Sequence, residues 1–168
     1  FTHMKAKDLK YIWNELFPNP KKQFDDYFKF TIVRNPWARR VSQWEFIKSK
    51  AKNDSLATFK GYCYSVMKDC HGSFTKFLLK SSKLDQQVNW IKDDNGNIIL
   101  DYIAKLEDLQ NGVNHICNKI DIDVKELPHI NQSVTGKKHY SEYYTKKMVD
   151  FLADIYADDI AEFNYDFI

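Results

Sequence analysis

The 168-residue sequence has little of what marks several special classes of protein. It contains only 3 cysteines and 4 prolines, and none of its apolar runs approaches the roughly 20 residues that cross a bilayer. Cys63, Cys70 and Cys117 are too few for a disulfide framework and match no metal-ligand spacing. We therefore expect three buried thiols in a reducing compartment, no metal, and no membrane-spanning segment.

An excess of charge of one sign is also missing. The 25 basic and 23 acidic residues are mixed along the whole chain and leave a formal net charge of +2. A field this weak argues against nucleic acid and membrane surfaces as partners, so any anion site must be local. With 43% hydrophobic and 29% charged residues, residues 1–168 are predicted to form a single globular domain.

Glycine is scarce, and no two glycines are close in the sequence. The five are Gly61, Gly72, Gly96, Gly112 and Gly136. A loop that cradles phosphates with successive backbone amides needs clustered glycines. The sequence therefore holds no such loop.

Apolar spacing and breaker residues divide the chain into helices and a few strands. An aromatic and β-branched run at 27–33 predicts a central strand of a parallel sheet, and 88–92 with 98–106 predict a hairpin whose turn is at 93–97. Residues 121–136 have no regular pattern. Helices are expected at 6–17, 36–50, 56–68, 73–80, 107–120 and 145–156.

The segment from Phe30 to Trp44, FTIVRNPWARRVSQW, is the most informative. It predicts a strand that ends at Arg34 and a helix that carries Ser42, and ligands of open α/β sheets bind at that edge. An arginine fork and a hydroxyl suit the oxygens of a phosphate. The alternative is that Arg34 pairs with an acidic side chain and Ser42 is an ordinary helix residue.

The order Arg-Asn-Pro-Trp, then Arg39 and Ser42, resembles the 3′-phosphate-binding motif of sulfotransferases that use 3′-phosphoadenosine 5′-phosphosulfate (PAPS). The pattern at His3 to Leu9, the block ending LEDL at Leu109, the LPHINQS run and the carboxy-terminal YYTKKMVDF stretch are similar to carbohydrate sulfotransferases of the membrane-bound type and their bacterial relatives. The resemblance covers nearly the whole chain.

This resemblance implies a helix-rich α/β fold, a P-loop-NTPase-like parallel sheet flanked by helices that lacks its first strand. It also implies PAPS as the donor, no metal, and a hydroxyl acceptor, typically on a carbohydrate. A bacterial member would be cytoplasmic, and a eukaryotic membrane-bound relative would face the Golgi lumen.

Several residues acquire expected roles from the resemblance. Arg34 and Ser42 would bind the 3′-phosphate, and of the pair Arg39 and Arg40 one would reach a phosphate while the other faces solvent. Arg39 matches the family position, and structural pairing is its alternative role. His3, in a Thr-His pair, would be the catalytic base, because an imidazole titrates near neutrality; its alternative is a capping or packing role.

The LPHINQS run supplies three more candidates, with a structural loop contact as the equal alternative. His129, Asn131 and Ser133 would line the donor or acceptor cleft.

One part of the family pattern is missing, since no loop of the Lys-x-Gly-Gly-Thr-Ser kind is present to hold the 5′-phosphosulfate. We expect this loop to precede Phe1. The alternatives are a non-catalytic domain that binds a 3′-phosphorylated nucleotide or a sulfated glycan, and a relative of nucleotide kinases.

Overall fold

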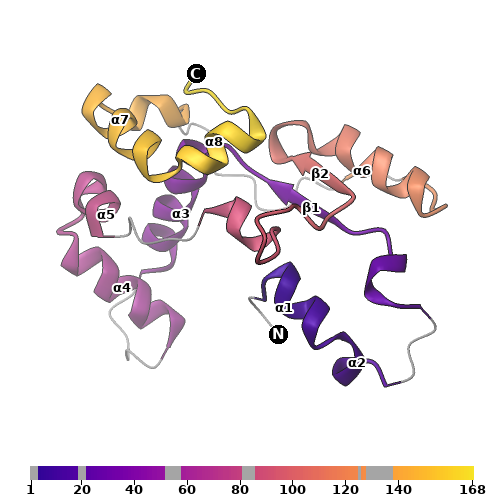
Figure 1. Cartoon of the computed structure of the whole chain (residues 1–168). Coiled ribbons are helices and arrows are strands. Elements are labelled where there is room, and N and C mark those ends of the chain that lie inside the picture. The colour runs from indigo at the N-terminus through magenta and orange to yellow at the C-terminus, as the bar shows by residue number, and fades with distance from the viewer. Residues whose placement is uncertain (1–3, 19–21, 52–57, 81–85, 125, 128–137) are drawn as a thin grey trace. The chain divides into compact units, whose positions relative to one another are not determined.

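The computed structural model describes residues 4–18, 22–51, 58–80, 86–124, 126–127 and 138–168. The chain divides into two compact units. Unit 1 comprises Phe1–Arg34 and Asp85–Gln132, and unit 2 comprises Asn35–Leu84 and Ser133–Ile168. Figure 1 shows the elements of both units along the chain.

Unit 1 contains the sheet. Strand β1 (Phe30–Val33) pairs in parallel with β2 (Tyr102–Lys105), with Phe30 opposite Tyr102 and Val33 opposite Lys105. Helix α6 (Leu109–Lys119) packs closely on β2, because a Cβ atom at Gly112 would lie 2.7 Å from the Cβ of Ala104. Glycine is thus the residue that lets helix and strand approach at this point.

The amino-terminal part of unit 1 is joined by aromatic rings. Helices α1 (Ala6–Tyr11) and α2 (Trp13–Leu16) are followed by a short 3₁₀ turn, η1 (Phe24–Asp26). The indole of Trp13 lies 5.6 Å from the ring of Phe24 and 5.2 Å from that of Tyr27, between ring centroids. These contacts fasten α2 to the segment that leads into β1.

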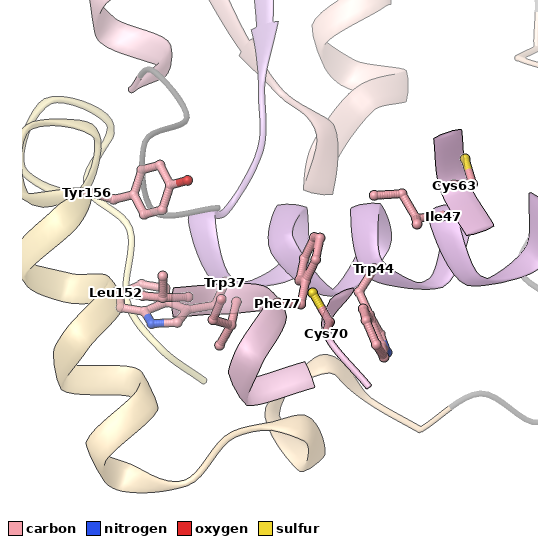
Figure 2. Packing of buried hydrophobic residues seen from close by; sticks show 9 residues of the cluster. Trp37, Trp44, Ile47, Cys63, Cys70, Phe77, Leu152 and Tyr156 are labelled. Carbon is pink, nitrogen blue, oxygen red and sulfur yellow. The ribbon is translucent and has the colours of Figure 1, made fainter. Parts of the chain in front are cut away.

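Unit 2 is helical in its described residues. It contains a 3₁₀ turn, η4 (Tyr140–Tyr143), which precedes α7 in the chain, and the helices α3 (Pro36–Lys50), α4 (Phe59–Asp69), α5 (Phe74–Lys80), α7 (Lys146–Ile155) and α8 (Ala157–Phe163). Their apolar faces meet in one cluster, in which Figure 2 shows the rings of Trp37, Trp44 and Phe77. Leu152 and Tyr156, each 1% exposed, extend the cluster to the last helices.

The described structure confirms a helix-rich α/β fold with a parallel strand pair. It confirms the helix at 36–50, and it places helices close to the ranges expected for 56–68, 73–80, 107–120 and 145–156. The P-loop-like detail, the place of β1 at the centre of a larger sheet, and the single domain remain predictions.

The predicted hairpin forms only next to its turn. The 3₁₀ turn η2 (Gln87–Trp90) occupies most of the first predicted strand. Near the turn, the arms are joined by the bridge between Lys92 and Ile98 and by backbone hydrogen bonds from Asp93 to Asn97 and from Ile99 to Ile91. The Asp93 carboxylate accepts hydrogen bonds from the backbone N–H groups of Asn95 and Asn97, so the expected turn does form. The strand signal at 98–106 belongs instead to β2, which pairs with β1.

Three smaller expectations also change. The helix predicted at 6–17 is interrupted at Ile12, where α1 ends and α2 begins. Cys63 and Cys70 are buried as expected, but Cys117 is only half-buried. The strand expected at 27–33 is confined to Phe30–Val33.

Candidate functional site

The junction between β1 and α3 is built by local interactions that the sequence favours. The Asn35 side chain caps α3 by accepting hydrogen bonds from the backbone N–H groups of Trp37 (3.1 Å) and Ala38 (3.2 Å). Its amide nitrogen donates to the backbone carbonyl of Asp166 at 2.9 Å. Pro36 occupies the first helical position, where a missing N–H is harmless. The start of α3 is therefore fixed by the Asn35 cap, by the hydrogen bond of Asn35 to Asp166 and by Pro36.

Arg34 ends unit 1, and its backbone is held by one side chain. The Gln87 Oε1 atom accepts a hydrogen bond from the Arg34 N–H at 3.0 Å, and Gln87 Nε2 donates to the Arg34 carbonyl at 2.8 Å. Both polar groups of this residue are thus satisfied as they would be in a strand ladder. The amide of Gln87 fixes the backbone from which the half-buried Arg34 side chain projects.

Sequence reasoning missed Gln87. It lies 53 residues from Arg34 in the chain, directly before the segment 88–92 that was predicted to be a strand, and no local pattern distinguishes it from Gln86. Only the tertiary structure brings the two residues together.

Arg39 and Ser42 lie three residues apart on α3, a spacing that places both on the same side of a helix. The Nη1 atom of Arg39 is buried and has no hydrogen-bond partner among the described residues. The half-buried Ser42 hydroxyl likewise makes no hydrogen bond to another described residue. Buried donors are nearly always satisfied, so the Arg39 Nη1 atom has the capacity to donate a further hydrogen bond.

The expectation that one of the two neighbouring arginines faces solvent is wrong, because Arg40 is only 1% exposed and Arg39 is half-buried. Its guanidinium lies over the ring of Phe77, 4.7 Å from the ring centre, and Nη1 donates to Gln43 Oε1 at 2.6 Å. Burial lowers the pKa of Arg40, while the neighbouring Tyr156 and Tyr144 oppose that shift. Arg40 is therefore a core residue that joins α3 to α5.

Two tyrosines surround this buried cation from the carboxy-terminal half of unit 2. Burial raises the pKa of both Tyr144 and Tyr156, and the Arg40 guanidinium reduces the shift in each case. The Tyr144 hydroxyl donates to the backbone carbonyl of Trp37 at 2.9 Å. Both phenols are thus neutral at physiological pH, and that of Tyr144 helps to hold the first turn of α3.

Arg34 and the Arg39–Ser42 pair belong to different units. His3, His129, Asn131 and Ser133 lie outside the described residues.

The fold defines the general class of this protein, an α/β protein in which a strand of a parallel pair leads into a capped helix carrying arginine and serine. The chain matches the family model described as the sulfotransferase family over residues 1–166. It therefore belongs to the sulfotransferase family, whose activity is the transfer of a sulfuryl group.

A similar protein is known from Archaeoglobus fulgidus. That uncharacterized protein is 28% identical over 113 residues, which cover 61% of this chain and 74% of the relative. No solved structure matches this chain. Within the described part of the chain, no helix has the length and apolar character required to traverse a bilayer.

Proposed function

We propose that this chain uses PAPS as the sulfuryl donor and transfers the group to a hydroxyl of a carbohydrate. The observation that carries the proposal is the pair of donors on α3, the buried Arg39 Nη1 and the Ser42 hydroxyl, which have no partner among the described residues. A phosphate would satisfy both donors at once, and it would offset the like charges of Arg39 and Arg40.

Arg34, Arg39 and Ser42 would hold the 3′-phosphate of the nucleotide. The guanidinium of Arg34 suits two phosphate oxygens in a planar, charge-assisted geometry, and the hydroxyl of Ser42 adds a third donor. Gln87 would act as a positioning residue, because it fixes the backbone of Arg34 through two hydrogen bonds. The capped start of α3 would supply a rigid support for Arg39 and Ser42 within unit 2.

PAPS would supply the sulfuryl group, and 3′-phosphoadenosine 5′-phosphate (PAP) would be the leaving product. His3 would take the proton of the attacking hydroxyl as the new oxygen–sulfur bond forms and the bond to the 5′-phosphate breaks. His129, Asn131 and Ser133 would line the cleft in which donor or acceptor lies. No step in this scheme requires a metal ion.

The carbohydrate acceptor rests on the resemblance of the LEDL block and the LPHINQS run to carbohydrate sulfotransferases. A sugar hydroxyl has a high pKa, so its attack depends on a base that removes the proton during transfer. This requirement makes His3 the residue whose loss should matter most for turnover.

A transfer assay with radiolabelled PAPS tests the proposal on neutral oligosaccharides and on a simple phenol. We expect labelled oligosaccharide from the wild type and a loss of about 100-fold or more in His3→Ala. His115→Ala, which changes an exposed histidine of α6, is the matched control and should keep full activity.

Transfer to the phenol alone would refute the carbohydrate acceptor. Binding of PAP without transfer to any acceptor would favour the non-catalytic alternative.

A further inference from the structure

A small pocket is lined by residues of α5 and α7, both of which belong to unit 2. Its volume is about 230 Å³. None of the residues assigned to nucleotide or acceptor binding contributes to it. The lining residues are Thr75, Leu78, Leu79, Lys147, Met148 and Phe151.

The walls of this pocket are apolar and anchored in the core. Leu78 is 1% exposed and belongs to the buried cluster, whereas Leu79 beside it is 57% exposed. The Thr75 hydroxyl donates to the Met148 sulfur at 3.8 Å, a weak contact that links the two helices at the pocket. Water is poorly held by such walls, so the pocket suits an apolar group.

Size limits what that group can be. Pockets for drug-sized ligands span about 300–1,000 Å³, and this one is smaller. It is large enough for one short alkyl chain or one aromatic ring, and too small for a macrocycle or a long lipid.

Lys147 is the charged residue among those that line the pocket. Within the described residues no carboxylate lies within ion-pair distance of it, whereas the adjacent Lys146 pairs with Asp150 at 3.6 Å. The exposed ammonium of Lys147 is therefore available to an anion at the edge of an apolar pocket. An exposed ion pair contributes little to affinity, so the apolar contact must supply most of the binding free energy. The charge of Lys147 would mainly orient the ligand.

We propose that the pocket between α5 and α7 binds a small amphiphilic monoanion, with its alkyl chain or single ring against Leu78, Met148 and Phe151 and its head group at Lys147. This site is independent of sulfuryl transfer and of the nucleotide. It stands on residues of unit 2 alone.

The test is a calorimetric titration of the whole chain with n-octyl sulfate below its micelle concentration. A titration with n-octanol tests the alkyl group without the charge, and a titration with inorganic sulfate tests the charge without the alkyl group. We expect octyl sulfate to bind, octanol to bind more weakly, and sulfate alone to give no heat.

Two neighbouring lysines provide matched variants. Lys147→Met should weaken octyl sulfate about two- to fivefold and leave octanol unchanged. Lys146→Met should leave both affinities as they are. Thr75→Phe, which places a ring in the pocket, should abolish binding of both probes while circular dichroism shows the native helix content.

Three results would overturn the proposal. One is the absence of octyl sulfate binding, and another is an equal loss in Lys146→Met and Lys147→Met. The third is competition of octyl sulfate with PAP together with loss of binding in Arg34→Ala, which would assign the probe to the nucleotide site. Failure of PAP to bind would leave this proposal intact, so the two proposals fail separately.

Discussion

The two units differ in how they are held together. In unit 2 the buried side chains form a continuous cluster of aromatic and aliphatic groups from α3, α4, α5 and α7. In unit 1 the outward residues of β1, Phe30 and Ile32, are 45% and 44% exposed, although strands of parallel sheets are usually covered on both faces. Packing therefore supports the Arg39–Ser42 pair, whereas hydrogen bonds from Gln87 support Arg34.

The largest expected effect of a single change is in the core of unit 2. Trp44, which is 4% exposed, packs on Phe77 with ring centres 5.2 Å apart. We expect Trp44→Ala to lower the free energy of unfolding by about 3–5 kcal/mol. Denaturant titration followed by circular dichroism measures this change.

Phe46 lies on the same helix but is 49% exposed, so Phe46→Ala is the matched control and should cost under about 1 kcal/mol. Ile32→Ala is the counterpart in unit 1 and should cost similarly little. Losses of equal size at Trp44 and Ile32 would contradict the comparison between the units.

The two adjacent arginines of α3 should separate stability from binding. Arg40→Ala removes the contact with Phe77 and the hydrogen bond to Gln43, so we expect the free energy of unfolding to fall by about 2 kcal/mol. Arg39→Ala should change it by less than about 0.5 kcal/mol. The same denaturant titration measures both variants.

For the affinity for PAP we expect the reverse order, with a larger effect of Arg39→Ala than of Arg40→Ala. Arg39→Ala should weaken PAP about tenfold or more, because it removes a charge-assisted hydrogen bond. Lys48→Ala, an exposed cation on the same helix, serves as the control for net charge. If Arg39→Ala bound PAP like the wild type, Arg39 would not be a phosphate ligand.

Gln87→Ala tests the support of Arg34. The substitution leaves the Arg34 N–H and carbonyl without their partner, and we expect a loss of about 1–2 kcal/mol in unfolding free energy. A positioning role also predicts that the affinity ratio of PAP over 5′-AMP falls. Gln86→Ala is the neighbouring control, and an unchanged ratio in Gln87→Ala would limit Gln87 to a structural role.

The smallest expected effect is a pH dependence in unit 1. The Asp101 carboxylate accepts a hydrogen bond from the Lys29 N–H (2.7 Å) and pairs with the Lys29 ammonium (2.9 Å), and these contacts hold the pKa of Asp101 below its usual 3.8. Because the pKa of Asp101 is lower in the folded state than in the unfolded state, its carboxylate stabilises the fold at pH values above the unfolded-state pKa. This stabilisation is lost as the pH falls through the folded-state pKa.

Because the Asp101 side chain is 44% exposed, we expect a loss of at most about 0.5 kcal/mol between pH 7 and about pH 3. The fall in unfolding free energy over this range should be smaller in Asp101→Asn by that amount. A fall of the same size in both proteins would show that Asp101 does not contribute.

The contrast between the units also explains which predictions succeeded. The helix at Pro36–Lys50 is encoded locally by the Asn-Pro cap and by apolar spacing, so its boundaries could be predicted. The extent of the hairpin could not be predicted, because beyond the residues beside the turn β2 satisfies its backbone against β1, about 70 residues away, and not against its neighbour in sequence.

The candidate site divides in the same way. Arg34, Arg39 and Ser42 could be selected from one continuous motif. The burial of Arg40 and the role of Gln87 depend on side chains distant in sequence, Phe77 and Arg34, which no local spacing indicates.

The most direct test of the central claim is a calorimetric titration of the wild type and of Arg34→Ala with PAP, with 5′-AMP as the ligand that lacks the 3′-phosphate. We predict that PAP binds the wild type at least about tenfold more tightly than 5′-AMP does, and that Arg34→Ala removes this difference. Equal affinities of the wild type for the two nucleotides, or an undiminished preference for PAP in Arg34→Ala, would contradict the assignment of Arg34 to the 3′-phosphate.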